Sequence, residues 1–136
     1  MAEQAETSSP RSAEWDLFEP VHAVPERLAV IAEAALERNA RDGVVLDLRG
    51  LSDATDYFVV LGGDSDVHVR AVADNVTERV EEATGEVPAG VEGREAGRWI
   101  LLDYIDIVVH VFLPEAREFY QLERLWADAP AAELGE

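Results

Sequence analysis

Two aspartates follow a glycine pair in an arrangement that could hold a metal ion. Gly62-Gly63 closes a run of apolar residues, and Asp64 and Asp66 come directly after it. A glycine-containing turn that leads into a helix can cradle an anion, and a carboxylate pair can hold Mg²⁺ beside nucleotide phosphates. These residues therefore raise the hypothesis of a nucleotide-binding enzyme that uses Asp64 and Asp66.

The same residues also have a structural interpretation. Ser65 is placed to cap a helix, and Asp64 and Asp66 would lie favourably near the positive end of its dipole. The chain contains no lysine, no P-loop, no Gly-x-Ser-x-Gly elbow and no Rossmann fingerprint. We prefer the structural interpretation, so no catalytic, cofactor-binding or metal-ligating residue is expected and the protein is predicted not to be an enzyme.

Histidine offers a second candidate for chemistry. His110 lies in an apolar strand pattern and could be a metal ligand or a general base. Asp106 shares its strand face but lies about 13 Å away at roughly 3.3 Å per residue, too far to share one ion directly. His68 has no matching ligand pattern nearby. We therefore interpret His110 as a histidine of the core or of an interface.

The charge of the chain favours a basic protein partner. Among 136 residues, 29 are acidic and 11 are basic, which gives a net charge of −18 with no cluster of basic residues. Such a surface repels phosphate backbones, so direct recognition of nucleic acid is not expected. The absence of cysteine, of a signal peptide and of a membrane-length apolar run predicts a soluble cytoplasmic protein.

The apolar pattern predicts an α/β fold. Helical spacing occurs in residues 25–41, 65–83 and from 114 onward, where Phe119, Leu122 and Trp126 return to one side. Strand patterns occur at 44–48, 57–61, 87–91, 98–103 and 106–113, the last two forming an antiparallel hairpin. Pro88 pushes 87–91 toward a sheet edge. This order predicts a single mixed β-sheet of about five strands packed with helices.

The same sequence patterns divide the chain into one domain and two tails. Residues 1–22 are polar and predicted to be a disordered tail, although Trp15, Leu17 and Phe18 could dock on the domain or on a partner. Residues 23–127 form the predicted domain, and residues 128–136 form a frayed C-terminal tail.

Several segments in one order resemble a known family. They are GLSDATDYFVV at 50–60, SDVHVRAVADN at 65–75, VEG at 91–93, RWILLDY at 98–104, DIVVHVF at 106–112 and REFYQLERLW at 117–126. Together they are similar to ribosomal silencing factors of the Iojap-like family, over roughly residues 25–126. The fold of that family in turn resembles nucleotidyltransferases.

The resemblance implies a regulator of translation and ribosome biogenesis. Such a protein binds the large ribosomal subunit through its fourteenth large-subunit protein, blocks joining of the small subunit and represses translation when nutrients are short. The alternative is a nucleotidyltransferase-like enzyme. An exposed edge strand and an apolar hairpin surface would favour a homodimer.

The resemblance also places the ribosomal-protein contact on the hairpin, at Trp99, Leu102, Asp103 and Tyr104. Strand alternation puts Trp99, Leu101 and Asp103 on one face and Leu102 on the other. From the residues alone, Trp99 and Leu102 could simply be core residues. The resemblance instead favours a contact role for Trp99 and Tyr104. The family often carries glycine where this chain has Ile105, so we expect a different turn type or a loop longer than two residues.

Overall fold

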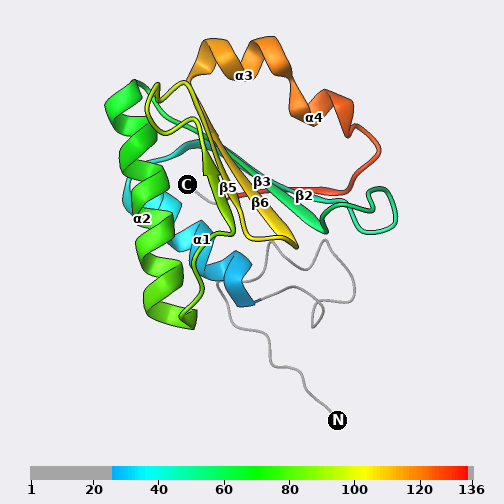
Figure 1. The fold of residues 1–136 in the computed structure, drawn as a ribbon. Coiled ribbons are helices and arrows are strands. Elements are labelled where there is room, and N and C mark those ends of the chain that lie inside the picture. Colours follow the sequence, from blue (N-terminus) through cyan, green and yellow to red (C-terminus); the bar gives the residue numbers. More distant parts are fainter. Residues whose placement is uncertain (1–25, 135–136) are drawn as a thin grey trace.

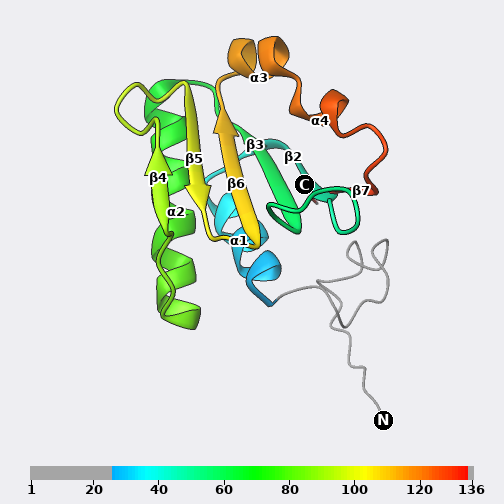
Figure 2. The same ribbon diagram turned by 45° about the vertical axis from the view of Figure 1, so that its right-hand side comes forward.

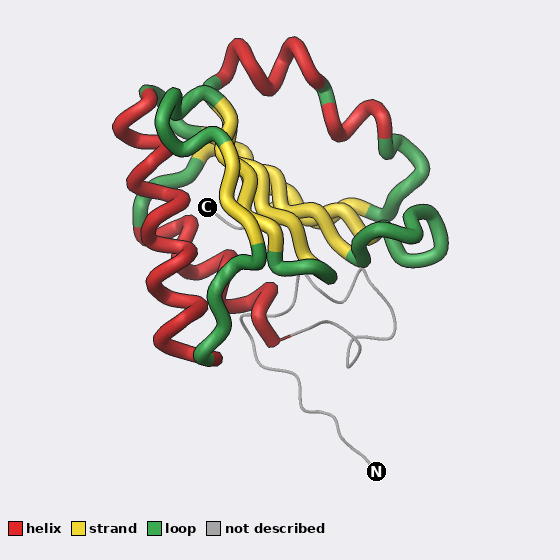
Figure 3. Tube along the Cα trace, viewed as in Figure 1, coloured by secondary structure: helices red, strands yellow, loops and turns green. Residues whose placement is uncertain are grey.

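The fold is a mixed open sheet with helices on both faces, as Figure 3 shows. The computed structural model describes residues 26–134. Its elements are α1 (Glu26–Glu37), β2 (Arg41–Asp47), β3 (Tyr57–Gly62), α2 (Asp66–Thr84), β4 (Gly90–Glu92), β5 (Trp99–Asp103), β6 (Ile107–Phe112), α3 (Pro114–Tyr120), α4 (Leu122–Leu125) and β7 (Ala131–Glu133). The predicted α/β class with one mixed sheet is confirmed.

The strands lie in the order β4-β5-β6-β3-β2-β7. Only β3 and β6 run parallel among the described strand pairs, and the other neighbours are antiparallel. The predicted β5–β6 hairpin is confirmed, and β4 lies at the sheet edge as Pro88 indicated. A parallel pair at the centre of the sheet requires the long crossover that contains α2.

The two faces of the sheet are covered differently. α1 and α2 pack side by side against one face (Figure 1) and bury the main core there, including Leu28, Val72 and Val109. α3 and α4 pass over the other face from the end where β6 finishes (Figure 2). They form a smaller cluster with Phe112 and Val60. Part of that second face therefore lacks a helical cover among the described residues.

α2 begins and ends as its sequence predicts. Ser65 is extended and its hydroxyl accepts a hydrogen bond from the His68 amide at 3.1 Å. Gly85 ends the helix with φ +81°, a left-handed conformation that glycine adopts without steric cost. These contacts satisfy backbone groups that the helix ends would otherwise leave free.

The C-terminal part differs from the prediction in two ways. Gln121 adopts φ +49° and divides the predicted last helix into α3 and α4. Phe119 therefore does not return to the side of Leu122 and Trp126, and its side chain is 79% exposed. The sequence carries no proline or glycine at this break, so helical spacing alone could not locate it.

The predicted fraying from residue 128 is wrong for the residues up to 134. Ala131–Glu133 form β7, which pairs with the edge of β2 and raises the strand count to six. Ala132 is buried, and the Leu134 amide donates to the Gly43 carbonyl at 2.9 Å. Three small or acidic residues give no strand signal of their own, so this strand is set by the free edge of β2.

The turn between β5 and β6 is not longer than two residues, but it differs in type from the usual hairpin turns, because the Asp106 amide donates to the Tyr104 carbonyl at 3.0 Å. Tyr104 and Ile107 close a loop of only two residues, with the Tyr104 amide donating to the Ile107 carbonyl at 2.8 Å. Ile105 adopts φ +77° at the first loop position, where such hairpins usually carry glycine. A β-branched residue at positive φ stores backbone strain.

Candidate functional site

The part of the second sheet face that α3 and α4 leave uncovered is the candidate site. We define this open face by five half-buried apolar residues: Phe58, Trp99, Leu101, Val108 and Trp126. Strand alternation places Trp99 and Leu101 on the same side of β5, and Val108 pairs with Phe58 across β6 and β3. A contiguous apolar surface of this kind is typical of a binding site for another protein.

Trp99 is held in a defined position on this face. Its indole Nε1 donates to Nδ1 of His110 at 3.0 Å. Its ring stacks on Phe112 with 4.9 Å between centroids and also contacts Tyr120 at 4.5 Å. An aromatic side chain that is already ordered loses little conformational entropy when it binds a partner.

The contacts of His110 indicate that it positions Trp99 and favour this role over that of a metal ligand or general base. The imidazole is only 3% exposed, and this burial lowers its pKa to about 4, so the ring is neutral at neutral pH. Because Nδ1 accepts from the indole, the ring proton resides on Nε2. The ring also contacts Phe58 edge-on at 4.5 Å between centroids. The interpretation of His110 as a core or interface histidine agrees with these contacts.

The four residues assigned to the ribosomal-protein contact divide between the two faces. Trp99 and Asp103 lie on the side of the open face, where Asp103 is half-buried and accepts from the Ile105 amide at 2.8 Å. Leu102 and Tyr104 are only 2% and 4% exposed and belong to the core beneath α1 and α2. In this structure the side chains of Leu102 and Tyr104 therefore support the hairpin from behind.

Four residues of the open face were not assigned from sequence: Phe58, Leu101, Val108 and Trp126. Alternation along β5 already placed Leu101 on the same face as Trp99, so its position could be predicted from the sequence. Phe58 and Val108 become neighbours only because β3 pairs with β6 in parallel across a long connection. That pairing leaves no local signal in either strand.

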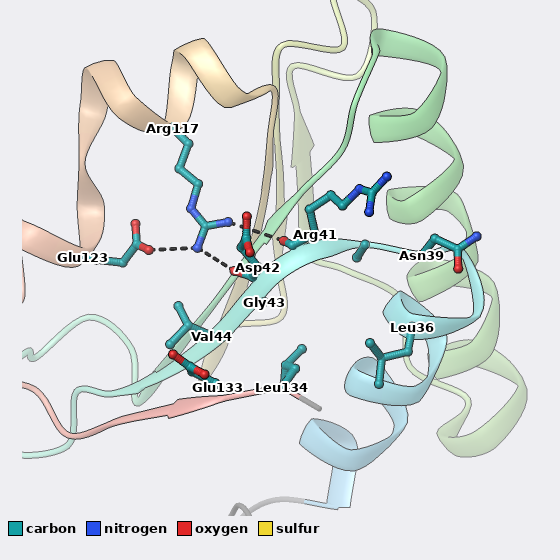
Figure 4. Close-up of a pocket in the computed structure, with 11 residues that line it drawn as sticks. Leu36, Asn39, Arg41, Asp42, Gly43, Val44, Arg117, Glu123, Glu133 and Leu134 are labelled. Atoms are coloured by element: carbon teal, nitrogen blue, oxygen red, sulfur yellow. Dashed lines mark hydrogen bonds and ion pairs between the residues drawn. The ribbon is translucent and has the colours of Figure 1, made fainter. Parts of the chain in front are cut away.

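A polar hollow lies at the other end of the sheet, beside the start of β2 (Figure 4). It has a volume of about 650 Å³ and is lined by Arg41, Asp42, Arg117 and Glu123 among others. The Arg117 guanidinium donates to the Asp42 carbonyl at 2.7 Å and to the Glu123 carboxylate at 2.8 Å. The central cation of the hollow is therefore already neutralised by the protein itself.

The aspartate pair is similarly engaged. Asp64 forms an ion pair with Arg41 at 2.9 Å, and Asp66 forms one with Arg70 at 2.7 Å. Hydrogen bonding to these arginines lowers the pKa of each carboxyl. Within residues 26–134, no group of three histidine or acidic side chains is close enough to hold a metal ion. The geometry thus favours a helix cap with ion pairs over a magnesium site.

Comparison with known proteins agrees with the fold and the motifs. The sequence model described as "Ribosomal silencing factor during starvation" matches residues 21–136. The chain belongs to the ribosomal silencing factor family.

Individual members of the ribosomal silencing factor family are similar over most of the chain. The Bacillus subtilis "Ribosomal silencing factor RsfS" is 40% identical over 107 residues, which are 79% of this chain and 90% of that protein. The mouse protein "Mitochondrial assembly of ribosomal large subunit protein 1" is 34% identical over 92 residues, 66% of this chain and 40% of the mouse protein. A crystal structure of a Chromobacterium violaceum protein matches with a TM-score of 0.72 and 36% identity, covering 75% of this chain and 84% of that one.

The family is one of regulatory proteins of translation. None of the helices between residues 26 and 134 combines the length and apolar character needed to cross a membrane.

Proposed function

We propose that this protein binds the large ribosomal subunit in the cytoplasm through its fourteenth large-subunit protein. The bound domain blocks association with the small subunit by occupying its place, and translation falls when nutrients are short. The observation that carries the proposal is the open face, an apolar surface on which the tryptophan Trp99 is held in position by a hydrogen bond to His110. Steric exclusion requires no reaction, which suits a fold in which Asp64 and Asp66 are engaged in ion pairs.

Charge supports a ribosomal protein as the partner. The net charge of −18 attracts a basic surface and speeds encounter with it. On the hairpin, Asp103 flanks Trp99 and Leu101 and provides an acidic rim for the apolar contact. An apolar centre with a charged rim is the usual arrangement of a specific protein interface.

The named relatives support the large subunit as the target. The mouse relative is named for assembly of the ribosomal large subunit, and the bacterial relatives are named as ribosomal silencing factors. Transferred to this chain, these names favour a partner on the large subunit over free nucleic acid.

A subunit-joining assay tests the blocking step. Purified large and small subunits are mixed with increasing protein, and joining is followed by light scattering. We expect joining to fall in proportion to bound protein, and Trp99→Ala to need a much higher concentration for the same effect. Unchanged joining at a protein concentration that saturates the large subunit would show that the protein does not act by exclusion.

A further inference from the structure

The open face lies within reach of the residues that precede α1 in the sequence. We propose that Trp15, Leu17 and Phe18 dock on the open face of the same chain and compete there with the partner. These three residues lie outside the described part of the structure. The proposed docking is argued from geometry and composition. The proposed competition with the partner also rests on the proposed function.

The start of α1 lies beside the β5–β6 turn, at the end of the sheet where Phe58 and Val108 of the open face lie. Arg27, in the first turn of α1, forms an ion pair with Asp106 of the turn at 2.5 Å. The Asp106 carbonyl accepts from the Asp56 and Tyr57 amides at 3.0 and 3.1 Å, which joins the start of β3 to the same point. Figures 1 and 2 both show α1 beginning next to this turn.

The open face begins a short distance from that point. Val108 follows Asp106 by two residues, and Phe58 follows Asp56 by two, so each lies about 7 Å further along its strand. Passing from the helical layer to the opposite side of the sheet adds about 10 Å, the usual spacing of packed layers. The segment must therefore cover a path of less than about 20 Å.

The connecting residues are long enough for this path. Phe18 precedes Glu26 by eight residues, which reach about 26–29 Å when fully extended. Pro20 and Pro25 lie within this connection and favour extended backbone on their N-terminal sides. A connection of this length raises the effective concentration of the anchors at the face into the millimolar range.

The composition of the segment fits an apolar face. Large apolar side chains are rare before Pro20, and three of them fall within the four residues Trp15 to Phe18. In an extended segment Trp15 and Leu17 point to one side, which suits a flat sheet surface. Trp126 and Phe58, which contact each other edge-on at 6.2 Å, offer an aromatic site for such anchors.

Charge limits the strength of this docking and makes it reversible. Glu14, Asp16 and Glu19 surround the anchors, while Asp103 and Glu92 flank the face. Like charges repel, so added salt should strengthen docking of the segment. The same salt should weaken the binding of a basic partner. A basic partner therefore displaces the segment most readily at low salt.

Cross-linking tests the docking in the full chain, because the protein has no cysteine of its own. Leu17→Cys is combined with Leu101→Cys on the open face, and separately with Glu78→Cys on the exposed side of α2. A short bismaleimide should link the 17–101 pair within one chain at several-fold higher yield than the 17–78 pair. Equal yields would overturn the proposal, and a predominantly dimeric product would show that a second copy occupies the face instead.

A second measurement does not depend on substitutions in the domain. Amide chemical shifts of the wild type are compared with those of the Trp15→Ala, Leu17→Ala, Phe18→Ala triple variant. We expect changes centred on β3, β5, β6 and the residues around Trp126, and these changes should grow with added salt. Unchanged shifts in the domain, or changes centred on α1 and α2, would refute docking on the open face.

The competition is then measured separately with large ribosomal subunits. The triple variant should bind several-fold more tightly than the wild type. Equal affinity would refute competition even if the cross-link forms. If neither protein binds, the proposed function fails while the cross-linking result still decides the docking.

Discussion

The indole Nε1 of Trp99 donates a hydrogen bond to Nδ1 of His110 across the β5–β6 hairpin, at 3.0 Å. This bond links a half-buried aromatic residue on the open face to a fully buried imidazole. It fixes both the orientation of the indole and the tautomer of the histidine. The binding residue and the core are therefore coupled, and the coupling can be measured through pH.

Stability should fall as pH is lowered because of His110. Burial lowers the pKa of His110 to about 4, below the ordinary value near 6.5. Between pH 4 and pH 6.5, a proton therefore binds this histidine in the unfolded chain more readily than in the folded chain. The His110 contribution is thus fully present above pH 6.5 and lost toward pH 4. Urea unfolding should show an extra loss of about 2 kcal/mol between pH 7 and pH 5 relative to His110→Asn. Parallel pH profiles of wild type and variant would contradict the assignment.

Adjacent leucines on β5 should differ sharply in their effect on stability. Leu102 is buried beneath α1 and α2, so Leu102→Ala should lower the free energy of unfolding by about 2–5 kcal/mol. Leu101 is half-buried on the open face, and Leu101→Ala should cost about 1 kcal/mol or less. Chemical denaturation of both variants measures this contrast. A larger cost for Leu101→Ala would mean that the two faces of β5 have been exchanged.

Glycine at position 105 should stabilise the hairpin. Ile105 holds φ +77° with its side chain 63% exposed, so removing the side chain relieves strain and loses little packing. After the entropy cost of glycine in the unfolded chain, Ile105→Gly should gain about 1 kcal/mol. Ile105→Ala, which keeps a Cβ atom, should gain less. A lower melting temperature for the glycine variant would argue against positive φ at this turn.

Nucleotides should leave the melting temperature unchanged. Asp64 and Asp66 are engaged by Arg41 and Arg70, and binding of magnesium with a nucleotide would have to break these ion pairs. A ligand that binds the folded state raises the melting temperature, so thermal unfolding with ATP, GTP and Mg²⁺ is a direct test. An upward shift that Asp64→Asn abolishes would revive the nucleotidyltransferase-like alternative.

Local patterns predicted the elements whose signals lie within a few residues. The stripe from Val69 to Val80 predicted α2, Ser65 predicted its start, and the apolar runs predicted β3, β5 and β6. β7 escaped prediction because its pairing with β2 is a long-range contact between weakly patterned residues. The break at Gln121 likewise occurs without a proline or glycine that would mark it in the sequence.

For the same reason, the candidate site could be predicted only in part from the sequence. Alternation along β5 separates Trp99 and Leu101 from Leu102, and this separation is confirmed in the structure. The family resemblance favoured Tyr104 as a contact residue, yet its side chain is buried beside the strained turn. Phe58 and Trp126 join the face only through the parallel β3–β6 pairing and the path of α4. Neither relationship leaves a trace in the local sequence.

Co-sedimentation with purified large ribosomal subunits tests the central claim most directly. Wild type is compared with Trp99→Ala and Leu101→Ala, and with Val67→Ala, which removes an exposed apolar side chain away from the open face. The wild type and Val67→Ala should pellet with the subunit, whereas Trp99→Ala should lose about 2 kcal/mol of binding or more, at least roughly 30-fold in affinity. Circular dichroism confirms that each variant is folded. Equal pelleting of folded Trp99→Ala and wild type would contradict a role for the open face, and a wild type that stays in the supernatant would contradict binding to the large subunit.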